Sequence, residues 1–279
     1  MSAPDQLLVV IDPVARRGDG ESVRIARDVL RAGATVKVSL PDTPEEFARA
    51  LARRGSRRPV VIGDDRALLR TVTHLHQGRE LADGALAVIP VGPGPTVRLA
   101  ASLGVPPDAV TAARAVLDGA ERRLDLLVDD GDGVVVGGLR IPAGPVRVGE
   151  PADQVASVWG TCRSLVRTLV RPAPQPRVPE MRAHRLRVEA DGRVLCDLDS
   201  PVEGVTVTSR DGAAEVVVRP RAAEPVRAEA TAVTVSGVSG AAFRYRADAL
   251  MAGPVWSRTW TVSPAAWSLV VPAGARVPE

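Results

Sequence analysis

Short apolar runs alternate with amphipathic segments along the first third of the chain. The apolar runs predict buried strands, and the segments between them carry apolar residues at helical spacing. The predicted strands cover residues 7–11, 35–40, 58–63 and 84–92. The predicted helices cover residues 21–33, 43–55 and 66–77. Because buried strands that alternate with helices form a parallel sheet covered on both faces, this part is predicted to be an α/β, Rossmann-like domain.

The carboxyl ends of these strands are the expected ligand-binding edge, since open parallel sheets bind ligands there. Three loops fall at this edge, at residues 12–18, 63–66 and 91–96. A strand that feeds a helix through a tight turn is a common phosphate site. In VVIGDDRALLRTV (Val60–Val72), however, Asp64 and Asp65 stand where an anion would lie.

The second half of the chain has a different pattern. Asp-Gly pairs follow and precede short alternating runs, as in RLRVEADGRVLCDL, which predicts hairpins of an antiparallel β-sandwich. One helix is predicted over Gln154–Arg171, followed by a proline-rich connector. The predicted domains are residues 1–124, α/β, and residues 125–279, β-sandwich. The last stretch of about 20 residues, which includes SRTWTVSPAAWSLVVP, is a candidate to return to the first domain.

The composition is that of a folded chain, with 45% apolar and 25% charged residues. Lys37 is the only lysine, so a lysine-containing P-loop is excluded. The three histidines and two cysteines form no zinc signature, and no metal site is predicted. No signal peptide and no apolar run of about 20 residues is present, which predicts a cytoplasmic protein.

Several motifs follow one another along the chain. Asp12-Pro13 follows the first strand, and Gly63-Asp64-Asp65-Arg66-Ala67 ends the third. IPVGPGPTVRLAASLGVP comes next, and RRLDLLV and, far downstream, DGAAEVVVRP complete the order. This order resembles the diacylglycerol kinase catalytic-domain family, which includes bacterial lipid kinases and sphingosine kinases and is related to NAD kinases. The family has Gly-Gly-Asp-Gly-Thr at residues 63–67, then a Gly-Thr-Gly-Asn-Asp turn and a Leu-Gly-Ile-Pro ending; Leu103-Gly104-Val105-Pro106 keeps that ending, but the Asn and Asp of the turn are absent.

The resemblance implies a kinase domain followed by a substrate-side sandwich, and ATP-dependent phosphorylation of a lipid hydroxyl with Mg²⁺. It places the catalytic base at Asp211, at the start of DGAAEVVVRP. The residues that it implies for nucleotide binding are Asp12, Gly63, Asp65, Arg66, Gly92 and Gly94.

The signature loops depart from the family pattern. Two signature glycines are Asp64 and Arg66, and the threonine is Ala67. Side chains there keep backbone N–H groups away from a polyphosphate, and Pro93 and Pro95 remove donors from the next loop. The alternative hypothesis is therefore an inactive relative that needs no cofactor and binds a lipid or a protein, or acts as a regulatory module.

Simpler interpretations stay open for single residues. Asp65 is also a candidate N-cap of the helix that follows, and Asp211 an ordinary hairpin turn residue. Residues 219–227, RPRAAEPVR, are either a solvated basic edge or a surface for anionic headgroups. Trp256, Trp260 and Trp267 line an acyl pocket, touch a membrane interface or, as we favour, belong to the core.

The expected partner is a lipid or another small-molecule substrate, with peripheral membrane contact and a homodimer as further alternatives. Nucleic-acid binding is not expected, because the net charge is only +3 and no basic–aromatic interleaving is present.

Overall fold

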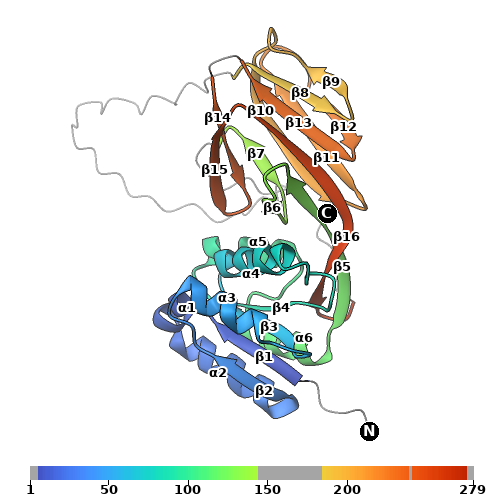
Figure 1. The fold of residues 1–279 in the computed structure, drawn as a ribbon. Helices are drawn as coiled ribbons and strands as arrows, with labels where there is room; N and C mark the ends of the chain where they lie inside the picture. The colour runs from blue at the N-terminus through green and yellow to red at the C-terminus, as the bar shows by residue number, and fades with distance from the viewer. Residues whose placement is uncertain (1–5, 144–183, 239–240, 275–279) are drawn as a thin grey trace, which may run out of the picture.

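The computed structural model describes residues 6–143, 184–238 and 241–274, which form an α/β unit and two antiparallel sheets (Figure 1). The helix predicted over Gln154–Arg171 and the connector after it lie outside these residues. The prediction of an α/β fold with a parallel sheet followed by antiparallel β-structure is confirmed.

The parallel sheet has the strand order β2-β1-β3-β4. Its strands are β1 (Gln6–Ile11), β2 (Thr35–Ser39), β3 (Arg58–Gly63) and β4 (Ala87–Pro90). Every residue of β4 and all but the first of β1 and β3 are buried, so helices cover both faces. The helical segments are α1 (Pro13–Gly18), α2 (Gly20–Gly33), α3 (Pro44–Ala52), α4 (Asp65–Gln77), the 3-10 turn η1 (Gly94–Thr96), α5 (Arg98–Ser102) and α6 (Ala109–Asp118).

Local sequence explains where these helices begin. Thr43 accepts a hydrogen bond from the backbone of Glu46 at 3.2 Å, and proline follows at the first helical position, as the capping pattern predicts. The short helix α1 was not predicted: its residues fall in the segment treated as a loop, where Asp12 caps Val14 at 2.8 Å. Six residues are too few for a helical apolar pattern to be read from sequence.

Two six-stranded antiparallel sheets form the rest of the described chain and enclose a second apolar core. The first sheet runs β12 (Val226–Ala230), β11 (Ala213–Pro220), β10 (Val202–Arg210), β7 (Leu139–Ile141), β14 (Phe243–Ala247), β15 (Leu250–Val255). The second runs β6 (Val134–Val135), β5 (Ala120–Asp129), β16 (Ser257–Val271), β13 (Ala232–Gly237), β8 (Leu186–Ala190), β9 (Arg193–Cys196).

Strands β5 and β16 join the two units, and they run side by side from the sandwich down to the α/β unit in Figure 1. Leu124, the predicted boundary, lies inside β5. The carboxyl end of β16 reaches β4's edge, where Leu86 donates to Ser268 at 2.8 Å and Val270 donates to Leu86 at 2.9 Å. Trp267 and Leu269 lie in the same apolar core as the parallel sheet. One strand therefore contributes to both cores.

Three of the four tryptophans lie among the described residues, and their environments differ. Trp260 and Trp267 are fully buried, as predicted for core residues. Trp256 is 60% exposed, so the core prediction is wrong for this residue. It follows β15, a strand at the sheet edge, where nothing in the described chain covers its outer side.

Candidate functional site

The carboxyl ends of β1, β3 and β4 bring the three predicted loops together. A Cβ atom on Gly63 would approach the Cβ of Ala67 to 2.7 Å and that of Asp12 to 3.0 Å. A Cβ on Gly92, which has a φ of +155°, would lie 2.8 Å from Thr96 Oγ1 and 3.6 Å from the Cβ of Asp64. Glycine is therefore required by close packing at both positions, whereas Gly94 has open space around it.

The N-terminus of α4 is capped by Asp64. One carboxylate oxygen of Asp64 accepts from the backbone N–H groups of Arg66 and Ala67, both at 3.1 Å. The interpretation of Asp65 as this cap is wrong, because Asp65 is already the first helical residue. The helix begins one residue earlier than predicted, since the extended conformation of Asp64 lets its side chain turn back onto the helix. Asp64 thus occupies the donors that would face an anion.

Asp65 points instead to the next helix. Its buried carboxylate accepts from the backbone N–H groups of Leu99 at 2.9 Å and Ala100 at 3.0 Å, at the start of α5. Burial raises the pKa of Asp65, and the two hydrogen bonds oppose that rise. The residue ties the two signature loops to each other.

Asp12 and Arg66 complete the predicted nucleotide set. Asp12 is buried and lies 3.3 Å from an Nη of Arg70, whose guanidinium stands 5.1 Å over the ring of Phe47. Arg66 is exposed and has no ion pair in the part of the chain that the structure describes. Of this set, Arg66 alone presents a cation to solvent.

Asp211 lies in the turn between β10 and β11, with a φ of +53°. The turn is held by Asp125, which accepts from Gly212 at 2.7 Å and from Ala265 at 2.8 Å. The Asp211 carboxylate is exposed and has no hydrogen bond or ion pair within the described residues. Its role as a catalytic base stays a prediction.

Sequence reasoning missed a second carboxylate, Asp248, in the turn between β14 and β15. Its φ is +49°, and its oxygens accept from the backbone N–H groups of Val136, Gly137 and Gly138 at 2.8, 2.7 and 3.0 Å. Desolvation raises the pKa of Asp248, the three hydrogen bonds oppose the rise, and the charge of Asp65 adds to it. The two carboxyl groups therefore share one electrostatic environment at the junction of the two units.

Packing at the same junction also brings the loop held by Asp248 close to the helix held by Asp65. A Cβ on Gly137 would meet Leu99 Cδ1 at 2.7 Å, so the loop that Asp248 holds lies directly against α5. Asp248 had no sequence signature to reveal it, because the turn ADAL lacks the glycine that marks the other hairpins.

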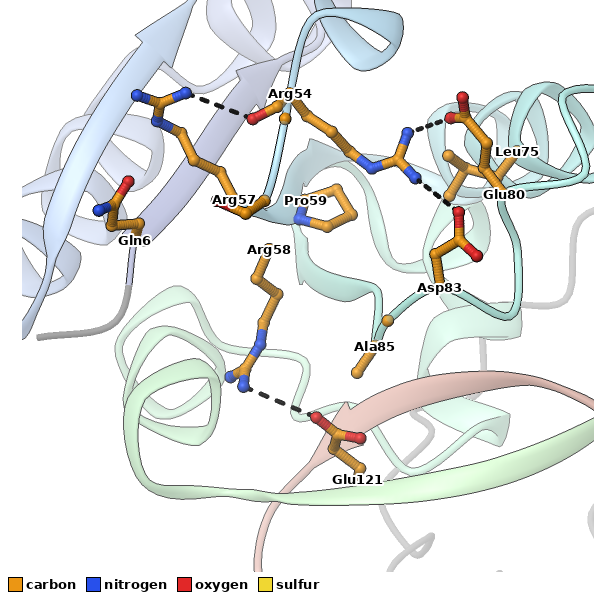
Figure 2. A pocket seen from close by; sticks show the side chains of 13 residues that line it. Gln6, Arg54, Arg57, Arg58, Pro59, Leu75, Glu80, Asp83, Ala85 and Glu121 are labelled. Atoms are coloured by element: carbon orange, nitrogen blue, oxygen red, sulfur yellow. Dashed lines mark hydrogen bonds and ion pairs between the residues drawn. The ribbon is translucent and has the colours of Figure 1, made fainter. Parts of the chain in front are cut away.

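A hollow of about 470 Å³ lies at the opposite, amino-terminal edge of the parallel sheet (Figure 2). Two of its three arginines form ion pairs: Arg54 contacts Glu80 and Asp83, and Arg58 lies 3.6 Å from Glu121. The third, Arg57, donates to the backbone oxygen of Arg54 at 3.3 Å. Figure 2 shows these pairs spanning the hollow. Since the charges neutralise one another, this hollow is a structural ion-pair network rather than a ligand site.

Metal clusters and membrane-spanning helices are both absent from residues 6–143, 184–238 and 241–274. In these ranges no group of three or more His, Cys, Asp or Glu side chains is placed to hold a metal ion. Over the same ranges, no helix has the length and apolar character needed to cross a membrane.

The stability role of Asp64 can be tested directly. Asp64→Ala is expected to lower the free energy of unfolding by about 1 kcal/mol, because two N–H groups at the start of α4 lose their acceptor. Asp64→Asn keeps an acceptor oxygen and is the matched control. Urea denaturation of the three proteins measures the effect, and an alanine variant as stable as wild type would contradict the cap.

The described structure was compared with known proteins. No protein-family model matches the chain, and no curated protein matches it in sequence. Solved structures from Bacillus anthracis str. Sterne do match. Two are described as a "putative diacylglycerol kinase", with TM-scores of 0.69 and 0.72, 12% and 13% identity, and coverage of 97% and 99% of this chain and 98% of each of theirs.

A third, described as a diacylglycerol kinase, has a TM-score of 0.71 and 11% identity over 99% of this chain and 100% of its own. Identities this low establish the fold alone. The chain therefore has the diacylglycerol-kinase-like fold that its sequence motifs predicted.

Proposed function

We propose that this chain is a binding module on a lipid-kinase fold, one that does not hold ATP at the signature loops. The observation that carries the proposal is the side chain of Asp64, which accepts from Arg66 and Ala67 at the N-terminus of α4. A phosphate would need those donors and would meet the negative charge of Asp64. The ligand expected for such a module is a lipid or another small molecule.

The neighbouring donors are occupied in the same way. Asp65 takes the N–H groups of Leu99 and Ala100, and Pro93 and Pro95 have none to give. The residues present therefore do not fit a polyphosphate. Each charge-assisted hydrogen bond contributes about 1.5–3 kcal/mol of binding free energy. The loss of a few such bonds is therefore enough to abolish binding at micromolar concentrations. Arg66 restores one contact at most.

Calorimetric titration with ATP–Mg²⁺ tests the proposal. We expect no saturation below about 1 mM, since a millimolar dissociation constant corresponds to only about 4 kcal/mol. Asp64→Gly is expected to strengthen binding at least tenfold, because it frees the α4 donors and removes one negative charge while Arg66 stays as a phosphate contact. The glycine at Asp64 costs only a few tenths of a kcal/mol as a cap. Micromolar binding at the signature loops of the unmodified protein would overturn the proposal.

A second candidate is an ATP-dependent lipid kinase, and Asp248 is the observation that favours it. A general base works best with a pKa near the working pH, and Asp248 has a raised pKa at the junction between the units. Labelled phosphate transfer from ATP to diacylglycerol is the assay. If transfer occurs, loss of activity in Asp248→Asn but not in Asp211→Asn would assign the base to Asp248, and the reverse would assign it to Asp211.

A further inference from the structure

A row of arginines crosses the outer face of the first antiparallel sheet. In the register of this sheet, Arg140 on β7 is directly opposite Arg246 on β14 and, on its other side, Thr206 on β10. Arg219 on β11 adjoins the row and donates to Thr206 Oγ1 at 3.4 Å. These side chains line a hollow of about 380 Å³ together with Gly138, Leu139, Thr208 and Asp248.

The row carries positive charge that no ion pair in the described chain neutralises. Opposed residues on neighbouring strands have Cβ atoms about 4.5–5.5 Å apart, and like charges placed so destabilise the sheet. Neither Arg140, Arg219 nor Arg246 has an ion pair with any acid in the described ranges. The nearest sheet acid in this register, Glu215, is held by Arg227 at 3.1 Å.

Arg246 supplies an independent observation. Its Nε is buried and has no hydrogen-bond partner among the described residues. A buried, charged N–H group without an acceptor is costly, and an ordered water, an ion or a ligand usually completes it. Nε atoms of Arg27, Arg122 and Arg258 share this feature, but only that of Arg246 belongs to a residue that lines this hollow. The hydroxyl groups of Thr206 and Thr208 add donors on the same side of the hollow.

We propose that this hollow is an anion site that binds the phosphate group of a ligand, with Arg140 and Arg246 as the principal contacts and Arg219 and the threonines around them. Planar guanidinium groups suit phosphate oxygens, because each presents two parallel N–H donors. The volume fits a phosphorylated headgroup rather than a bare ion. The inference deepens the proposed function, since it names the ligand class of the binding module.

The carboxylate of Asp248 also borders the hollow. Its two oxygens already accept hydrogen bonds from three backbone N–H groups of the 136–138 loop, and these donors offset part of its negative charge. The phosphate therefore meets the arginine side of the hollow, and Asp248 limits how far it enters.

Two arms test the site and separate the sources of phosphate. Glycerol phosphate and inorganic phosphate are titrated calorimetrically into the full chain, and phosphatidylcholine vesicles with and without phosphatidylglycerol are tested by flotation. Arg140→Ala and Arg246→Ala are expected to weaken binding at least tenfold in whichever arm binds. Binding of the soluble phosphates alone identifies a free metabolite, and binding of the anionic vesicles alone a lipid headgroup; either supports the site.

The control is Arg210→Ala, which removes an exposed arginine without an ion pair in the described residues from the same sheet but lies outside the hollow. Equal losses in Arg210→Ala and Arg140→Ala would show diffuse charge attraction and overturn the site, as would no binding in either arm. The ATP titration is independent: ATP binding that persists in Arg140→Ala/Arg246→Ala overturns the proposed function and leaves the anion site standing. ATP binding lost in that double variant belongs to the hollow.

Discussion

Replacing Trp267 with alanine is expected to lower the free energy of unfolding by about 3–5 kcal/mol, the range for removing a large buried aromatic side chain. Trp267 is fully buried in the core of the α/β unit, and its Nε1 donates to the backbone oxygen of Asp125 at 3.3 Å. The substitution leaves a cavity, and the backbone oxygen of Asp125 loses its hydrogen-bond donor. Few other single changes in this chain remove as much buried surface.

The position of Trp267 makes the expected loss global. It lies in β16, which pairs with β5 along most of its length and reaches Leu86 at the edge of the parallel sheet. Loosening this strand therefore weakens the core of the α/β unit and the second antiparallel sheet together.

Denaturation followed by far-ultraviolet circular dichroism and by tryptophan fluorescence measures the loss. We expect both probes to shift together in Trp267→Ala. The matched control, Trp256→Ala, removes the same side chain from a site that is 60% exposed, and should change stability by no more than about 0.5 kcal/mol. A loss below 1 kcal/mol in Trp267→Ala, or one confined to a single probe, would contradict the shared role of β16.

The parts of the fold that were predictable are those with local, periodic patterns. The strand ending at Gly63 and the helix after it follow directly from apolar periodicity, and their observed limits differ from the prediction by a single residue. The alternating runs of the second half gave the antiparallel sheets in the same way. The order of motifs then linked these elements to a known fold.

The functional details depend on contacts that no local pattern encodes. Asp64 and Asp65 are adjacent in sequence, yet one caps its own helix and the other reaches Leu99, 34 residues away. Asp248 accepts a hydrogen bond from Gly137, which lies 111 positions away in the sequence. The opposition of Arg140 and Arg246 depends on strand register, which a one-residue slip would destroy. Such pairings follow from tertiary structure, so a single sequence did not predict them.

Asp248→Ala is expected to lower the free energy of unfolding by about 2–4 kcal/mol. Three backbone N–H groups, of Val136, Gly137 and Gly138, lose a charged acceptor worth about 1.5–3 kcal/mol for each bond, and water replaces part of that because Asp248 is only partly buried. Alanine also adopts the positive φ of this turn less readily than aspartate. The loop that packs against α5 should therefore become the first part to exchange its amide protons.

Asp248→Asn separates the charge of this residue from its hydrogen bonds. The pKa of Asp248 is raised in the folded state, chiefly by desolvation, above an unfolded value of about 3.9. A raised carboxyl pKa stabilises the fold fully below the unfolded pKa, and this contribution is lost as pH rises through the folded pKa. Wild type should therefore exceed Asp248→Asn in stability most at acid pH, with the gap narrowing toward neutral pH.

Urea denaturation of wild type and Asp248→Asn between pH 4 and pH 7.5 measures this gap, and Asp211→Asn, which removes the same charge from an exposed turn, controls for net charge. The negative charge of Asp65 helps to raise the pKa of Asp248. Asp65→Asn removes this repulsion, so it should lower the pKa of Asp248 and with it the pH at which the stability gap closes. A gap between wild type and Asp248→Asn that is constant over this range, or that widens toward neutral pH, would mean that Asp248 is held as an ordinary ionised acceptor. In that case its three backbone hydrogen bonds would lower its pKa more than burial raises it. Asp248 would then have a structural role only and would not act as a base that gains and loses a proton.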